Sequence, residues 1–138
     1  MSIQENKAVV RRLVEAAQVG RDLSVVDELL SPDFVDHSPM AGLLPTREGV
    51  KILFAGLHNA FPDLSVIIRE QVAEGETVVT RKTFIGTHAG EFLGVPASNK
   101  KIEFDVIDML RVVDGRITEH RHIVDQLGLL QQLGAIAR

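Results

Sequence analysis

The sequence predicts an α+β fold, with helices packed on one face of an antiparallel sheet. Up to Phe61, apolar residues recur at the spacing of amphipathic helices. From Leu64 onward the pattern changes to β-branched runs, and the pair Asp114-Gly115 is typical of a two-residue hairpin turn. Because the helical segments come first and the strands follow as a group, the order favours the α+β class.

Capping residues and prolines bound three predicted helices in the first part of the chain. Ser2 followed by Glu5 has the spacing of a capping box at the start of the first helix. Gly20 is expected to close that helix in a left-handed conformation. The residue before a proline avoids the helical region, so prolines mark the ends of the other two helices. The residues that bound these two helices are Asp22 and Pro32, and Thr46 and Pro62.

Four strands and a closing helix are predicted in the second part of the chain. The strands are rich in β-branched residues and are separated by turn residues. Between the second and third predicted helices, residues 33–40 are expected to be irregular and extended. The predicted strands are 64–72, 77–87, 101–113 and 116–124, and the closing helix is 126–133.

Length and composition indicate one soluble domain that spans residues 1–138. The chain has 45% hydrophobic and 25% charged residues, which is the balance of a globular domain. With a net charge of −4 and no basic cluster, it is not expected to bind nucleic acid. It has no cysteine, which excludes disulfides and zinc–sulfur sites. Since no apolar signal segment or membrane-length apolar run is apparent, we expect a cytoplasmic protein with no membrane partner.

One carboxylate interrupts an apolar row on the third predicted strand. The even-numbered positions of residues 101–113 are apolar except for Asp108. A buried carboxylate is costly unless it is paired or hydrogen-bonded. Asp108 is therefore a candidate pocket residue, and the alternative is a structural role in a salt bridge or a local bend.

The fourth predicted strand is dense in polar residues. Alternation places Glu119, Arg121 and Asp125 on one face, and His120 and His122 on the other. A carboxylate beside a cation in a pocket can act as a general base, which makes Asp125 and Arg121 catalytic candidates. The alternatives are a helix N-cap for Asp125 and a surface ion pair for Arg121. The two histidines are expected to be exposed. They could chelate a metal, but with no third ligand apparent we expect no metal site.

Loop histidines and phenylalanines are the expected substrate-binding residues. His37 and His88 lie in irregular segments, where polar residues at the open end of a cavity often have functional roles. The alternative for each is a structural hydrogen bond. The chain has no Trp or Tyr, so phenylalanine or histidine must supply any aromatic wall of a pocket. The phenylalanines expected there are Phe34, Phe61 and Phe92.

Six segments, in order along nearly the whole chain, resemble the SnoaL-like polyketide cyclase family. This family of ester cyclases lies within the nuclear-transport-factor-2-like superfamily. Each segment is weakly diagnostic by itself, and it is their order that identifies the family. The segments are FVDH at 34–37, AFPD at 60–63, GTHAGEF at 86–92, GVPA at 94–97, DGRITEH at 114–120 and DQLGLLQQLG at 125–134.

The resemblance implies a cone-shaped α+β barrel, with three N-terminal helices in the concave face of a curved, mostly antiparallel sheet. It also implies a homodimer or higher homo-oligomer, with no cofactor and no metal. Characterised members close a ring of aromatic polyketide methyl esters by an intramolecular aldol reaction. In them an aspartate near the end of the last strand is the acid/base catalyst, and by motif position that residue is Asp125.

The expected function is cofactor-independent cyclase or isomerase chemistry on a hydrophobic carbonyl substrate, by removal of a proton alpha to the carbonyl. The family often has Trp after the pair Glu119-His120, and this chain has Arg121 there. A cation at this position would lower the pKa of Asp125 and could bind an enolate oxygen. Two alternatives stay open. One is an epoxide or ester hydrolase that activates water with Asp108, Arg121 and Asp125, similar to limonene epoxide hydrolase. The other is a non-catalytic small-molecule binding protein.

Overall fold

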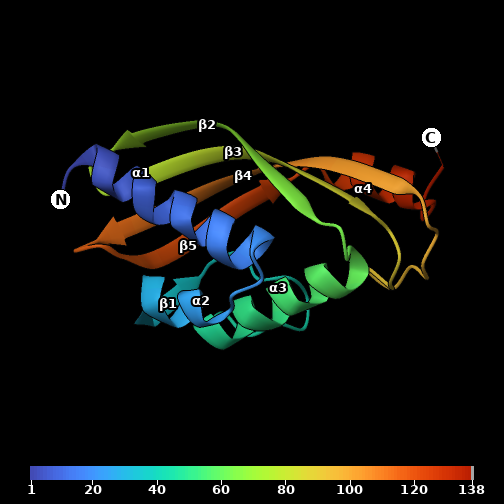
Figure 1. Ribbon diagram of the computed structural model, residues 1–138, viewed down its shortest axis with the longest axis horizontal. Helices are drawn as coiled ribbons and strands as arrows, with labels where there is room; N and C mark the ends of the chain where they lie inside the picture. The colour runs from blue at the N-terminus through green and yellow to red at the C-terminus, as the bar shows by residue number, and fades with distance from the viewer. Residues whose placement is uncertain (138) are drawn as a thin grey trace.

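Four α-helices and a five-stranded sheet make up residues 1–137, the part of the chain that the computed structural model describes (Figure 1). The first helix continues into a short π-helical segment, η1. Within these residues no helix is both long and apolar enough to cross a bilayer. The helical elements are α1 (Ile3–Arg12), η1 (Leu13–Val19), α2 (Ser24–Leu29), α3 (Arg47–Ala60) and α4 (Gln126–Leu133).

The sheet is open, with strand order β1-β5-β4-β3-β2. Neighbouring strands are antiparallel except for β1 and β5, which pair in parallel. In Figure 1, α1 lies across the sheet and α3 lies beside α2, whereas α4 lies at the far end of the strands. The predicted α+β class and mostly antiparallel sheet are confirmed, although the sheet does not close into a barrel. The strands are β1 (Leu30–Asp36), β2 (Ser65–Glu74), β3 (Thr77–Thr87), β4 (Lys101–Val113) and β5 (Arg116–Val124).

Strand β1 replaces the end of the second predicted helix. α2 ends at Leu29, and the strand begins at Leu30 and includes Pro32. Proline is tolerated there because β1 is an edge strand, and one side of an edge strand needs no ladder hydrogen bonds. The extended conformation expected for residues 33–40 is confirmed as far as Asp36.

The end of the first helix differs from the prediction by one residue. Gly20 keeps a right-handed conformation with φ −76°, and Arg21 has the positive φ of 62°. The Gly20 N–H donates to the carbonyl of Glu15 at 2.9 Å, a π-helical bond that reaches one residue further back than an α-helical one. The wider turn therefore holds Gly20 in the helix and moves the left-handed residue to the next position.

The β4–β5 hairpin determines which side chains share a face of the sheet. Its turn is Asp114-Gly115, where both residues have positive φ, 50° and 79°, as a type I′ turn requires. The register pairs Asp108 with His122 and Met109 with Arg121. Since side chains alternate along a strand, Asp108 and His122 face the helices and Arg121 faces away from them.

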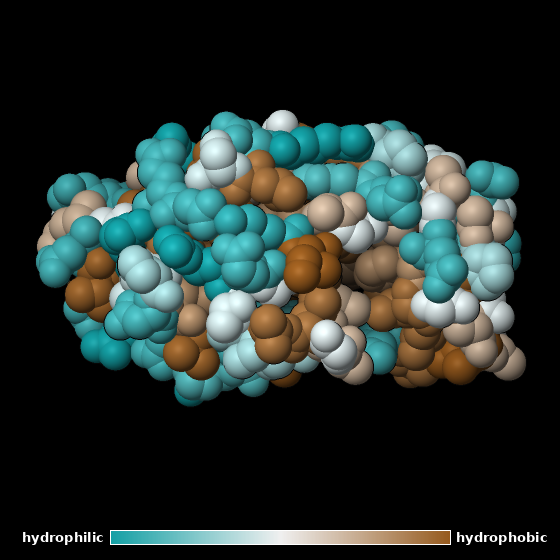
Figure 2. All heavy atoms as spheres, turned by 90° about the horizontal axis from the view of Figure 1, so that it is seen from below, coloured by the Kyte–Doolittle hydropathy of each residue, from teal (hydrophilic) through white to brown (hydrophobic). Residues whose placement is uncertain are grey.

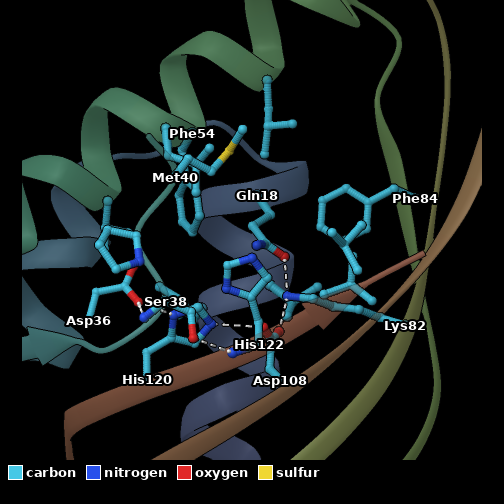
Figure 3. Close-up of a pocket in the computed structure, with 18 of the residues that line it drawn as sticks. Gln18, Asp36, Ser38, Met40, Phe54, Lys82, Phe84, Asp108, His120 and His122 are labelled. Atoms are coloured by element: carbon cyan, nitrogen blue, oxygen red, sulfur yellow. Dashed lines mark hydrogen bonds and ion pairs between the residues drawn. The ribbon is translucent and has the colours of Figure 1, made fainter. Parts of the chain in front are cut away.

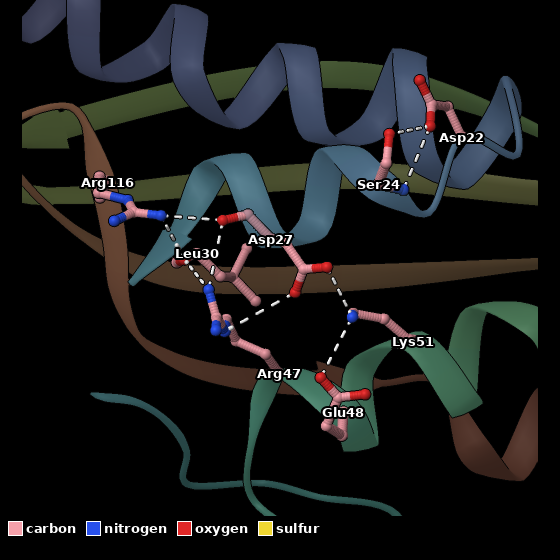
Figure 4. A network of polar contacts seen from close by, with 8 residues as sticks. All are labelled: Asp22, Ser24, Asp27, Leu30, Arg47, Glu48, Lys51 and Arg116. Carbon is pink, nitrogen blue, oxygen red and sulfur yellow. Dashed lines mark hydrogen bonds and ion pairs between the residues drawn. The ribbon is translucent and has the colours of Figure 1, made fainter. Parts of the chain in front are cut away.

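A network of polar contacts joins α2 to α3 and β5 (Figure 4). The guanidinium groups of Arg47 and Arg116 donate to the backbone carbonyl of Asp27 at 3.3 and 2.8 Å. Lys51 Nζ lies 2.7 Å from the Asp27 carboxylate. Cations near the last carbonyls of a helix satisfy oxygens that lack an intrahelical partner and interact favourably with the helix dipole. The network thus stabilises the end of α2, where the chain turns into β1.

Phe61 fills the core at the point where α3 approaches β3. Its side chain is 1% exposed, and Gly86 of β3 lies directly against it. A Cβ atom at Gly86 would lie 2.9 Å from the Phe61 Cβ, which is closer than a van der Waals contact allows. Glycine at this position therefore permits the close approach of the sheet to the end of α3.

The substitution Gly86→Ala is expected to lower the free energy of unfolding by about 1–3 kcal/mol, because an added methyl group overpacks this contact. The control is Gly56→Ala on α3, where a Cβ would meet no atom within 4 Å. Alanine there is expected to raise the free energy of unfolding by up to about 1 kcal/mol through helix propensity. Urea denaturation measures both values, and the same sign for the two variants would contradict the packing argument.

Candidate active site

A cavity of about 390 Å³ lies between the helices and the inner face of the sheet. Its walls are mostly apolar, and its volume is within the range of small-molecule sites. On the face seen in Figure 2, apolar side chains gather around a hollow while hydrophilic side chains cover much of the remaining surface. The phenylalanines that line the cavity are Phe34, Phe54, Phe84, Phe92 and Phe104.

Four charged side chains, Asp36, Lys82, Asp108 and His120, form the polar floor of the cavity (Figure 3). Lys82 Nζ lies 2.5 Å from Asp108 Oδ2, and both side chains are at most 7% exposed. His120 Nε2 lies 2.8 Å from Asp108 Oδ1, and His120 Nδ1 lies 3.0 Å from Asp36 Oδ1. Asp108 thus meets both alternatives considered for it, since it lines the cavity and forms a buried salt bridge.

Neighbouring elements position the polar floor. Lys82 comes from β3, Asp108 from β4, His120 from β5 and Asp36 from the end of β1. In the parallel pairing of β1 with β5, Asp36 lies opposite His120. Gln18 of η1 accepts a hydrogen bond from Lys82 Nζ at 3.0 Å and so connects the floor to the helical layer. With the histidine protonated, two anions and two cations balance, as buried charges require.

The lysine keeps Asp108 ionised despite its burial. Burial alone would raise the pKa of this carboxyl group. The Lys82 ammonium group and the hydrogen bond from His120 outweigh burial, and they hold the pKa of Asp108 far below its ordinary value. At neutral pH Asp108 is therefore an anion that is too weakly basic to remove a proton from carbon.

The two carboxylates keep His120 protonated. Burial would lower the pKa of its ring, but the hydrogen bonds to Asp108 and Asp36 raise that pKa to about 9. Both ring nitrogens therefore donate, Nε2 to Asp108 and Nδ1 to Asp36, and His120 is an imidazolium at neutral pH.

The adjacent His122 has the opposite protonation state. Its ring stacks on that of His120, with centroids 5.1 Å apart and an interplanar angle of 13°. Burial and the charge of His120 lower the pKa of His122 below its ordinary value of 6.5, so this ring is neutral at pH 7. Its Nδ1 is buried and has no hydrogen-bond partner within residues 1–137. Two titratable groups whose pKa values are pushed apart are typical of an acid and a base in one site.

Arg121 and Asp125 lie outside the cavity lining. Arg121 is exposed on the outer face of β5, opposite Met109. Asp125 is exposed at the N-cap of α4, where its Oδ1 accepts a hydrogen bond from the backbone N–H three residues further on, at 3.1 Å. The helix cap considered for Asp125 is thus confirmed. The grouping of Asp108, Arg121 and Asp125 in one pocket is wrong, because the register pairs Asp108 with His122.

The predicted aromatic residues divide between cavity and core. Phe34 and Phe92 line the cavity, as predicted. Phe61 does not line it; its ring is buried in the core and makes an edge-to-face contact with that of Phe92, with centroids 5.2 Å apart. Its contact with the cavity is therefore indirect.

The two loop histidines make structural hydrogen bonds outside the cavity lining. The ring of His37 is partly exposed, and its Nε2 lies 2.9 Å from the Glu119 carboxylate. His88 is fully buried, and its Nδ1 lies 2.9 Å from Ser98 Oγ. For both residues the structure therefore favours the alternative role over substrate contact.

Sequence reasoning missed Asp36, Lys82 and the inward position of the two histidines. Lys82 stands in the inward-facing row of β3, between Thr80 and Phe84, and this interruption was a usable signal. The expectation that His120 and His122 are exposed is wrong, because both face the helices and line the cavity. No local pattern pointed to Asp36, whose position depends on the pairing of β1 with β5.

An apolar cavity with a charged, hydrogen-bonded floor, held by helices on an open, mostly antiparallel sheet, is the arrangement of a site for a small hydrophobic molecule. The chain belongs to the SnoaL-like polyketide cyclase family, which matches residues 7–133. The resemblance seen in the sequence is therefore confirmed.

Individual relatives agree with this assignment. Aklanonic acid methyl ester cyclase DnrD of Streptomyces peucetius is 31% identical over 131 residues, which cover 91% of this chain and 88% of that protein. Nogalonic acid methyl ester cyclase of Streptomyces nogalater is 27% identical over 124 residues, 88% of this chain and 92% of that protein. Among solved structures, TsrD from Streptomyces laurentii superposes with a TM-score of 0.89 at 29% identity and covers 99% of both chains.

The two stacked histidines are expected to titrate separately. His120 should lose its proton at a pH of about 9, and His122 should titrate below 6.5. Ring ¹⁵N shifts measured by NMR, assigned with His→Gln variants, check both values. A His120 ring that is already neutral at pH 7 would contradict the charge assignment of the polar floor.

The same titration affects stability. The folded-state pKa of His120 is raised above its ordinary value of 6.5. Its contribution to stability should therefore be complete below about pH 6.5 and be lost as the pH rises through about 9. Urea denaturation at a series of pH values, on the wild type and on His120→Gln, isolates this contribution.

Proposed function

We propose that the protein catalyses an intramolecular aldol cyclisation of a hydrophobic, polyketide ester-like carbonyl compound without a cofactor. The observation that carries this proposal is the stacked pair of histidines, one neutral and one charged, at the floor of the apolar cavity. Family membership and the names of the relatives support cyclase activity. The pair of histidines supplies the base and the positive potential that such a reaction needs.

The substrate class is inferred from the cavity and the relatives. Two of the relatives are methyl ester cyclases of aklanonic and nogalonic acid. The cavity here has phenylalanines on several sides and a single polar floor. Such walls favour a flat, largely apolar substrate, with its reacting carbonyl groups directed toward the charged side chains.

In the proposed reaction, neutral His122 removes a proton from the carbon alpha to a carbonyl group. The resulting enolate carbon attacks a second carbonyl carbon of the same molecule, which forms one C–C bond and an alkoxide. The alkoxide then takes a proton back from the His122 imidazolium. No atom is gained or lost, so the product is an isomer of the substrate.

The polar floor would stabilise the negative charge that develops on the enolate oxygen. Lys82 has three N–H donors. Gln18 and Asp108 are its polar partners within residues 1–137, which leaves one donor for the substrate. The adjacent imidazolium of His120 adds positive potential in a site of low dielectric, where such charges act most strongly. Asp108 and Asp36 would orient this cation and keep it protonated.

The hydrolase alternative has no geometric support, because Arg121 and Asp125 lie outside the cavity lining that includes Asp108. The binding-protein alternative would need the same cavity without turnover. Both alternatives are distinguished from cyclisation by the product, since hydrolysis adds one water to the substrate and simple binding leaves the substrate unchanged.

The substitution His122→Ala is expected to lower kcat by a factor of about 10² to 10⁴, the usual contribution of a general base. KM should change little, whereas the thermal midpoint should fall somewhat because the stacking of this ring on His120 is lost. The assay follows conversion of aklanonic or nogalonic acid methyl ester by mass spectrometry. In the wild type, activity should fall below the pKa of His122 and again above about pH 9, as His120 loses its proton.

The matched comparison is Asp125→Asn. If Asp125 acts only as a helix cap, this variant keeps its kcat and nearly all of its stability, because asparagine caps a helix about as well as aspartate does. Loss of turnover in Asp125→Asn, together with an active His122→Ala enzyme, would return the acid/base role to Asp125 and overturn this proposal. Incorporation of ¹⁸O from water into the product would instead support the hydrolase.

The predicted homodimer also has a candidate surface. Ile107 and Ile123 are cross-strand partners on the outer face of β4 and β5, and they are 44% and 75% exposed. Met109 beside them is 46% exposed. A second copy of the chain that covers this face would bury these side chains by a symmetric contact.

We expect the wild type to sediment at twice its chain mass, and Ile123→Lys to sediment as a monomer, because it places a charge in an apolar contact. Ile52→Lys is the control, since Ile52 is 57% exposed on the opposite layer, on α3. Analytical ultracentrifugation at micromolar concentration measures both variants. A wild type that is already monomeric would contradict the predicted dimer.

A further inference from the structure

Three side chains at the floor of the cavity meet as potential metal ligands. One ligand atom from each of Asp36, His120 and His122 lies within 4.8 Å of the others. The two histidines are neighbours on one face of β5, and Asp36 comes from β1. The sequence showed the His-x-His spacing but no third ligand, and the parallel pairing of β1 with β5 supplies that ligand.

We propose that the Asp36–His120–His122 cluster binds one divalent transition-metal ion of the zinc class. This inference goes beyond the proposed function and does not depend on it, because ion binding is measured without substrate. Two imidazole nitrogens and one carboxylate oxygen are a donor set that suits zinc and its neighbours, whereas magnesium and calcium prefer oxygen alone.

The spacing of the ligand atoms is close to what a bound ion needs. His120 Nδ1 and Asp36 Oδ1 are 3.0 Å apart. Two ligands on a tetrahedral zinc, each about 2 Å from the ion, are about 3.3 Å apart. The two atoms are therefore only slightly closer together than two ligands of one zinc ion would be. The ligand atom of His122 lies within 4.8 Å of the other two, so this side chain would move closer to complete the set.

A second carboxylate already orients the central histidine. Asp108 Oδ1 accepts a hydrogen bond from His120 Nε2 at 2.8 Å, on the side of the ring away from Asp36. Metal-bound histidines commonly donate their other N–H group to a carboxylate, which fixes the tautomer and makes the ligand more basic. Lys82 holds Asp108 in place at 2.5 Å. The support that a metal ligand requires is thus built into the sheet.

His122 provides an independent observation. Its Nδ1 is buried and has no hydrogen-bond partner within residues 1–137. Asn6, Ser31 and His88 also have a buried polar atom without a partner, but of these residues only His122 belongs to the cluster, where metal coordination would satisfy its Nδ1. The remaining coordination position would face the cavity, since His120 and His122 both line it, as in zinc sites with three protein ligands and one open position.

The test is calorimetric titration of the chelator-treated chain with ZnCl₂ at pH 8, in a buffer that does not bind metal. We expect one ion per chain, with magnesium giving no binding. His122→Ala and Asp36→Asn should each weaken zinc binding at least tenfold. His37→Ala is the control, since His37 pairs with Glu119 outside the cavity and an effect there would indicate surface binding. Equal affinities in the wild type and His122→Ala, or no binding by the wild type, would overturn the proposal.

A second measurement uses the unmutated chain, so it does not depend on whether a variant folds. The ring ¹⁵N shifts of His120 and His122 should both move when ZnCl₂ is added, and shifts that zinc leaves unchanged would contradict their role as ligands. Bound zinc should also inhibit the proposed cyclisation, because it occupies the His122 base. Zinc binding in a chain without cyclase activity would leave this inference intact while the proposed function fails.

Discussion

The buried ion pair between Lys82 and Asp108 is the interaction on which the cavity floor depends. Either charge alone would be unstable in this place, since removing one partner of a buried pair typically costs about 3–5 kcal/mol. Together they leave Asp108 ionised and able to accept from His120, which keeps that ring charged. The charge of His120 then contributes to keeping His122 neutral. The protonation states of both histidines therefore follow from one pair of residues on adjacent strands.

The parallel pairing of β1 with β5 has a comparable role in the architecture. It places Asp36 opposite His120, and it is the one parallel contact in an otherwise antiparallel sheet of residues 1–137. Without it the imidazolium would have a single carboxylate partner. With it, His120 lies between two carboxylates, and one of them, Asp36, also meets His120 and His122 in the proposed ion site. The same strand pairing thus supports both the proposed chemistry and the inferred ion site.

Part of the site was predictable from local patterns. The interruption of an apolar row singled out Asp108, and alternation correctly separated the two histidines from Arg121. The error was the choice of face: the family motif suggested that Asp125 points inward, and alternation placed Arg121 on the same face as Asp125. Alternation shows which residues of a strand share a face of the sheet. It does not show which of the two faces is buried.

The sequence by itself determined the α+β class, the family and most of the elements, including strands 77–87, 101–113 and 116–124 and the helix 126–133. These features follow from periodicity, capping residues and turn residues, which are local properties of the sequence. Only the tertiary structure decided which polar residues meet. Lys82, Asp108, His120 and Asp36 are brought together by strand register and by a parallel strand pair. Such contacts join segments far apart in the sequence, and their energy comes from burial and charge pairing, which no local pattern records.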